Sequence, residues 1–149
     1  MTGSLLLLLH LLAAMAWLGG MFFAHFCLRP AAAQLLAPAQ RLPLMSAALG
    51  LFLRYMAAAV FLVLASGLAM FMAVGFLGAP VGWHIMLALG TVMALVYAYV
   101  VAVAYPALRT HCSAQAWADA ARALNRIRQL VTINLALGVL VVAAAVMAR

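Results

Sequence analysis

The chain has 149 residues, of which 72% are hydrophobic and only 6% are charged. Because a soluble domain carries about a quarter charged residues, this composition excludes a soluble domain and indicates an integral membrane protein. Eight arginines and no lysine oppose one acid, Asp119, and the formal net charge is +7. We interpret this charge as a signal of topology rather than of nucleic-acid binding, since basic residues of membrane proteins collect in cytoplasmic loops.

Four apolar stretches reach the roughly 20 residues that a helix needs to cross a bilayer. They cover residues about 4–27, 48–76, 83–106 and 129–148. This pattern predicts an all-α protein, a four-helix bundle in the membrane that forms a single transmembrane domain over residues 1–149. We expect the first stretch to be a span and not a cleaved signal peptide, because no basic residue precedes it and its apolar run continues to Phe26.

The arginines divide the connecting segments into two kinds. Arg29 and Arg41 lie between the first two spans, and Arg109, Arg122, Arg126 and Arg128 lie between the last two. The turn at 77–82 carries no charge. The positive-inside rule therefore predicts that both arginine-bearing segments are cytoplasmic and both termini are outside, with Arg149 as the one dissenting charge.

Residues 113–128 predict a cytoplasmic amphipathic helix that leads into the fourth span. Ser113 is placed to cap this helix, and Asp119 and Arg122 can pair because they are three residues apart. Its apolar stripe consists of Leu124, Ile127 and Leu130.

Two histidines lie within spans, where an ionisable side chain is costly unless it faces protein, a cofactor or water. His10 lies in the first span and His84 in the first turn of the third, and both spans run in the same direction. We expect both imidazoles in the outer half of the bundle, with Trp17 on the His10 face and small residues on the His84 face. Imidazoles on facing helices with room between them predict a haem iron held by His10 and His84. Met86, about half a turn further along the third span, is the reserve ligand.

Simpler interpretations of the two histidines stay open. A membrane histidine is often only a hydrogen-bond partner between helices, and small residues are ordinary packing material there. His84 follows Trp83 directly and could face lipid headgroups instead of a cofactor.

Arg54 lies about 9 Å inside the inner end of the second span, at 1.5 Å per residue. The spans contain no acid that could pair with it. We expect either that Arg54 binds the carboxylates of a haem, which suit bidentate contact with arginine, or that its side chain extends to the cytoplasmic headgroups.

Metal binding without haem is a second hypothesis. Met70 and Met72 end the second span at the level expected for the two histidines, and thioether together with imidazole suits Cu(I). A further candidate metal site, with two imidazoles and two thiols, lies at the inner ends of the first and third spans. Neither His-Cys pair in it has the standard spacing of zinc ligands. Its members are His25, Cys27, His111 and Cys112.

Asn134 and Gly138 in the fourth span predict an interhelical hydrogen bond at a close helix crossing.

The chain has no nucleophile, base and acid constellation, no Gly-rich phosphate loop and no paired carboxylates. These absences from the sequence exclude hydrolases and nucleotide-driven enzymes.

Four segments resemble the copper-resistance D (CopD) family of bacterial membrane proteins. They are "LHLLAAMAWLGGMFFAHFCLRPAA", "LRYMAAAVFLVLASGLAM", "GWHIMLALGTVMALVYAYVVAVAYPAL" and "ALNRIRQLVTINLALG". The resemblance rests on His10 with Trp17-Leu18-Gly19-Gly20, on Arg54, on Trp83-His84 and on the arginine-rich entry to the fourth span. It implies a multi-pass protein of the bacterial inner membrane.

The pattern is also similar to that of HemJ-like proteins, four-helix membrane proteins that bind haem b and oxidise protoporphyrinogen. This similarity implies haem b as the cofactor, with His10 as a ligand. Together with the positions in the spans, the expected cofactor-binding set is His10, His84, Arg54, Trp17 and Met86. If the chain is an enzyme, it implies a membrane oxidoreductase that acts on a porphyrin or a quinone. HemJ-like proteins usually carry a lysine at the start of the third span, where this chain has Met86.

Our leading expectation is therefore electron transfer through haem b, since an iron with both axial positions filled favours electron transfer. The alternative is a copper-binding or copper-uptake protein that uses Met70, Met72, His10 and His84. A third hypothesis is a cofactor-free accessory subunit, with a second copy or a respiratory complex as partner.

Overall fold

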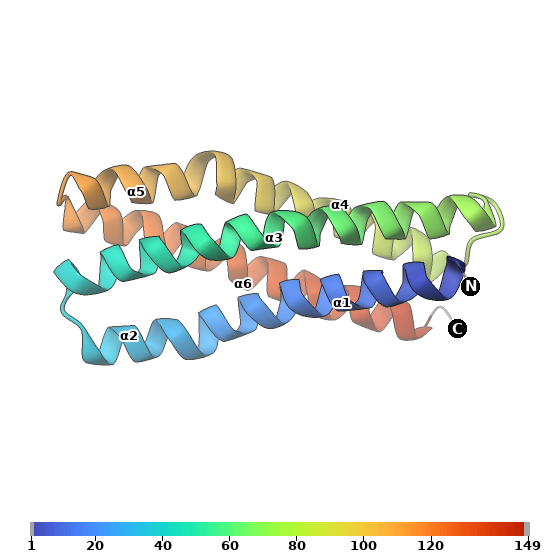
Figure 1. Cartoon of the computed structure of the whole chain (residues 1–149), viewed down its shortest axis with the longest axis horizontal. Helices are drawn as coiled ribbons and strands as arrows, with labels where there is room; N and C mark the ends of the chain where they lie inside the picture. The colour runs from blue at the N-terminus through green and yellow to red at the C-terminus, as the bar shows by residue number, and fades with distance from the viewer. Residues whose placement is uncertain (1, 148–149) are drawn as a thin grey trace.

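The computed structural model describes residues 2–147, and it contains four long helical rods joined by short turns (Figure 1). The first rod consists of three segments: α1 (Thr2–Phe23), η1 (Ala24–Leu28) and α2 (Arg29–Leu35). The remaining segments are α3 (Pro38–Val74), α4 (Val81–Tyr99), η2 (Val100–Ala104), α5 (Tyr105–Ser113) and α6 (Trp117–Met147). The prediction of an all-α protein with four long apolar helices is confirmed.

Every rod is long and apolar enough to cross a membrane. Most large exposed side chains are leucine, phenylalanine, valine or methionine. The buried polar side chains among residues 3–147 are only Ser46, Ser66 and Asn134. An apolar outer surface of this kind suits lipid and not water, so the chain is a multi-pass membrane protein.

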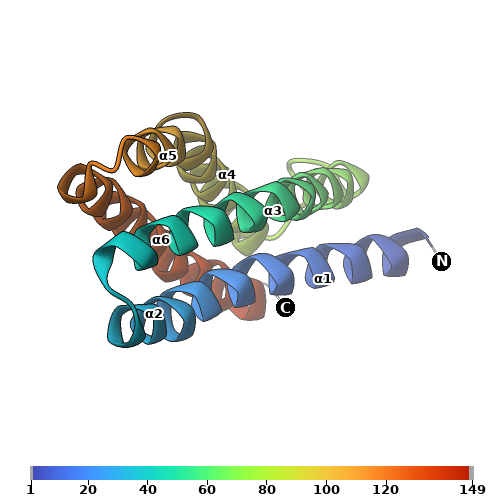
Figure 2. The same cartoon turned by 60° about the vertical axis from the view of Figure 1, so that its left-hand side comes forward.

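The bundle is built from two hairpins, which Figure 2 shows from a turned viewpoint. In the first hairpin α1 packs along α3, and in the second α4 and α5 pack along α6. α1 and α4 occupy diagonal corners and meet in the centre, where the rings of Trp17 and Tyr97 make an edge-on contact at 6.2 Å. This diagonal arrangement decides which functional side chains can share a site.

Prolines explain the two π-helical segments, η1 and η2. A proline ring inside a helix presses on the carbonyl four residues earlier and removes one hydrogen bond. For Pro30 and Pro106 that carbonyl belongs to Phe26 and to Ala102, the central residues of η1 and η2. The wider π turn accommodates the ring without ending the helix.

The segments between spans are more helical than the sequence predicts. The sequence pattern makes residues 28–47 a connection between two spans, yet α2 and the first part of α3 are helical and only 36–37 interrupt them. Ser113 does not begin the helix at 113–128, because it is the last residue of α5 and its hydroxyl donates to the carbonyl of Thr110. The chain then turns through Gln115, whose φ is 55°, and α6 begins at Trp117.

Other expectations for the start of α6 are confirmed. Asp119 and Arg122 form an ion pair on its surface. On the opposite side Ile127 is buried, and Leu124 and Leu130 pack against the same core cluster. The amphipathic stripe therefore attaches this end of α6 to the bundle.

The two ends of the bundle differ in charge. The neutral end contains the start of α1, the uncharged turn at 75–80 and the last turns of α6, which lie together in Figure 1. The basic end contains the α2–α3 and α5–α6 connections together with their arginines. This segregation agrees with the sequence pattern, and the cytoplasmic location of the basic end stays a prediction.

Candidate functional site at the neutral end

His10 faces the neighbouring helix α3. Its Nδ1 lies 3.0 Å from the Oγ of Ser66. Gly67 leaves the space in which the ring sits, because a Cβ at this position would lie 3.1 Å from His10 Cε1. Two and three turns further along the same face of α1, Trp17 and Met21 are buried. His10 therefore faces protein and not lipid.

The Ser66 hydroxyl decides which nitrogen of His10 is free. Its single proton is directed to the helix backbone, at the carbonyl oxygens of Leu62 and Val63. The oxygen of Ser66 then accepts, which assigns the donor role in this hydrogen bond to His10 Nδ1–H. Neutral imidazole with a protonated Nδ1 leaves the lone pair of Nε2 available for a metal or another donor.

His84 has different surroundings. Its Nδ1 lies 3.2 Å from the carbonyl oxygen of Pro80, and its ring lies edge-on to Phe71 and Phe76 at 5.0 and 4.8 Å. Further residues of the same α4 face, Thr91 and Leu95, are exposed on the outside of the bundle. The residues below His84 thus do not open a space between helices, because that face of α4 points outward.

The two histidines do not face a common space. α1 and α4 are diagonal in the bundle, and His84 packs at the level of Phe71, which is five residues, or about 7.5 Å, further along α3 than Ser66. Haem held between two imidazoles needs both rings to point at one iron. The contacts of His10 with Ser66 and of His84 with Phe71 and Phe76 do not bring the two rings together, and haem binding by this pair stays a prediction.

Arg54 lies on the outward face of α3. It is exposed, like Ala58, Phe61 and Ala65 on the same face. It also lies 12 residues from Ser66, which is about 18 Å along the helix. The position matches the second expectation for this residue, a side chain that extends along the lipid-facing surface to the headgroups.

The helical repeat places the candidate methionines on different helix faces. Met70 follows Ser66 by four residues and Gly67 by three, so it lies on the stripe of α3 that contacts His10. Met72 points away and is 69% exposed. Met86 lies two residues after His84, about 200° around α4, on the side of the buried Met93. Met70 therefore lies on the face of α3 that contacts His10. His84, Met72 and Met86 each point elsewhere.

The inner set of thiols and imidazoles does not converge. Cys27 is exposed and Cys112 is half-buried, and both are free thiols. His25 packs against the ring of Phe26 at 4.6 Å. Within the part of the chain that the structure describes, no three histidine, cysteine, aspartate or glutamate side chains gather as a metal site.

Sequence reasoning did not identify Ser66 and Gly67, the direct partners of His10. The signal was present, since a small polar residue and a glycine adjoin each other in an apolar span at the depth of His10. Small and hydroxyl-bearing residues mark helix contacts in membranes. The sequence does not state which of the other helices they contact.

Comparison with known proteins identifies the family. The profile of the family described as copper resistance protein D matches residues 46–148, a region that begins within α3, continues through α6 and includes Met70 and His84. No curated protein and no solved structure matches the chain. Since the match covers more than half of the chain and contains three of the four segments that carry the resemblance, the chain belongs to the copper resistance protein D family.

Proposed function

We propose that this protein binds copper(I) within the membrane at its neutral end and passes it on, as its part in copper resistance. Membership of the family supports a relation to copper. The observation that carries the proposal is the placement of Met70 on the stripe of α3 that holds His10. We treat copper as the cargo of the protein.

His10 and Met70 are arranged so that their donor atoms can approach one ion. Long side chains of a helix lean toward its N-terminus, so the thioether of Met70 extends back toward the turn that carries Ser66. That turn contacts His10 at 3.0 Å. From this placement we expect the free Nε2 of His10 and the sulfur of Met70 to reach the same region between α1 and α3.

The ligand types favour the reduced ion. Thioether and imidazole are soft to borderline ligands, and this combination is selective for Cu(I) over the harder divalent ions. Two protein ligands also leave the ion free to exchange, which passage through a membrane requires. The other two side chains of the expected copper set, His84 and Met72, are directed elsewhere and are not part of this proposal.

Copper(I) affinity, measured by competition with a chromogenic chelator on the detergent-purified protein, tests this proposal. We expect His10→Ala and Met70→Leu each to weaken binding by about tenfold or more, because each removes one of two ligands. Met72→Leu is the matched control, since it removes a thioether only two residues away and should leave the affinity unchanged. Equal affinity in all three variants and the original protein would refute the site.

Electron transfer through haem b is the competing function. His10 supports it, because this imidazole faces the bundle interior with a free nitrogen, but His84 does not provide the opposite ligand. A dithionite-reduced minus air-oxidised absorption spectrum of protein produced with ample haem decides between the two. We expect no haem b bands; sharp reduced α and Soret bands that disappear in His10→Ala would replace copper by haem.

A further inference from the structure

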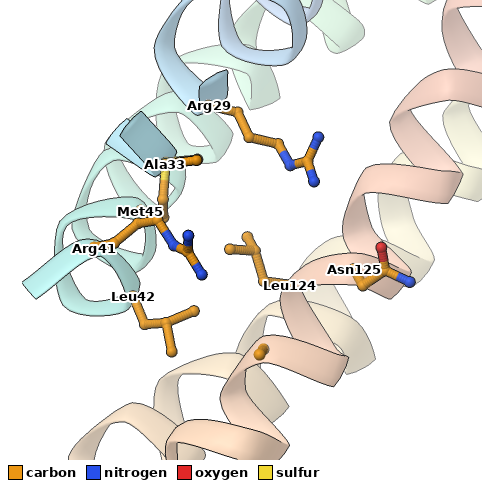
Figure 3. Close-up of a pocket in the computed structure, with 8 residues that line it drawn as sticks. Arg29, Ala33, Arg41, Leu42, Met45, Leu124 and Asn125 are labelled. Atoms are coloured by element: carbon orange, nitrogen blue, oxygen red, sulfur yellow. The ribbon is translucent and has the colours of Figure 1, made fainter. Parts of the chain in front are cut away.

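A cavity of about 150 Å³ lies at the basic end, far from His10 and Met70, between α2, the start of α3 and the start of α6. Figure 3 shows the side chains of Arg29 and Arg41 entering it from α2 and α3. Asn125 of α6 adds an amide at the far side. The inner wall is apolar, with Leu42 fully buried and Met45 almost so.

The positive charges of this cavity have no carboxylate partner. Arg41 and Arg128 lie close enough to Arg29 for their charges to act on it. The chain has a single acid, Asp119, and this carboxylate pairs with Arg122. Since like charges at a half-buried site repel one another, an external anion bound between Arg29 and Arg41 would offset this repulsion.

The chemistry of the walls specifies the anion further. Two guanidinium groups that reach into one space suit the oxygens of a phosphate, which arginine binds through paired hydrogen bonds. The cavity lies at one end of the apolar rods, the level at which phospholipid headgroups border a membrane bundle.

We infer that this cavity binds the phosphate of an anionic phospholipid headgroup, held by Arg29 and Arg41 while its acyl chains lie along α2 and α3. The lipid neutralises the arginines of the basic end and ties the α2–α3 connection to α6. Basic cavities between membrane helices are suited to such headgroups. This inference is independent of the copper proposal, because no residue is common to the two sites.

Native mass spectrometry of the full-length protein, delipidated in detergent and titrated with phosphatidylglycerol, tests the inference. Arg29→Gln combined with Arg41→Gln should weaken retention of the lipid by about tenfold or more, because two charge-assisted contacts are lost. Arg54→Gln combined with Arg109→Gln is the matched control, since it removes the same charge from exposed positions outside the cavity. Equal retention by the two double variants would overturn the inference.

Two further measurements distinguish a bound lipid from a free anion. Arg29→Lys with Arg41→Lys keeps the charge and loses the paired hydrogen bonds, so we expect intermediate retention by a protein whose helical circular dichroism is unchanged. Inorganic phosphate is the second probe, measured as a shift in thermal stability of the delipidated protein. If inorganic phosphate stabilises the protein through Arg29 and Arg41 while phosphatidylglycerol is not retained, the source is a free anion and the lipid assignment is wrong.

Discussion

At the scale of single residues, buried polar groups determine how the spans are joined. Asn134 of α6 is 3% exposed, and its Nδ2 donates to the carbonyl oxygen of Met93 on α4 at 3.2 Å. Its Oδ1 has no partner among the described residues. The amide therefore gains one interhelical hydrogen bond while one acceptor is left unsatisfied, which limits its net stabilisation.

Substitutions at Asn134 should separate these two contributions. Asn134→Leu removes both the hydrogen bond and the unsatisfied oxygen. We therefore expect the free energy of unfolding to fall by no more than about 0.6 kcal/mol, an average value for such membrane hydrogen bonds. Asn134→Asp places carboxyl oxygens against the Met93 carbonyl and should lower the free energy of unfolding by about 1–3 kcal/mol, the cost of a buried polar group without a partner. Unfolding in mixed detergent micelles, followed by tryptophan fluorescence, measures both; a larger loss for leucine than for aspartate would contradict this expectation.

At the scale of the helices, glycine permits close approach between two rods, and proline changes the turn within one rod. Gly138 lets α6 approach α1, since a Cβ there would overlap the Leu18 side chain. Gly90 of α4 has no atom within 4 Å of the corresponding Cβ position. Pro30 and Pro106 act differently, because each widens one turn and leaves the rod continuous.

The two glycines give a matched test of this packing. Gly138→Val should lower the free energy of unfolding by about 1–3 kcal/mol, the usual cost of overpacking. Gly90→Val adds the same atoms in open space and should change stability much less. The same micelle unfolding assay applies, and equal losses for the two variants would show that α1 and α6 are not in close contact at Gly138.

At the scale of the whole molecule, the charges are separated along the bundle axis. The neutral end holds the proposed copper ligands, and the basic end holds the proposed lipid cavity. Because basic segments stay on the cytoplasmic side, we expect the protein to bind copper near the outer side of the membrane. We expect it to bind the lipid in the inner leaflet.

Cysteine labelling tests this orientation in a Cys27→Ser, Cys112→Ser background. Leu77→Cys places a thiol in the fully exposed neutral turn, and Gln115→Cys places one in the α5–α6 turn. A membrane-impermeant maleimide should label Leu77→Cys in intact spheroplasts, and Gln115→Cys only after lysis. The reverse pattern would place the arginines outside.

Much of this protein follows from its sequence alone. Four apolar stretches of sufficient length require four helices, because a bilayer leaves no other way to pair the backbone N–H and C=O groups. The distribution of arginines predicted which connections lie together. Asn134 was correctly expected to form an interhelical hydrogen bond, although it bonds to α4 while Gly138 permits the close approach to α1. These properties are local, so a list of residues in order is enough to state them.

Only the tertiary structure decided which faces meet. All faces of these helices are apolar, so hydrophobic periodicity does not distinguish a surface that faces lipid from one that faces another helix. For this reason the sequence grouped His84 with His10, whereas in the structure His10 contacts Ser66 and His84 packs against Phe71 and Phe76. The pairing of His10 with Ser66 and the convergence of Arg29 and Arg41 likewise depend on contacts between segments distant in the chain.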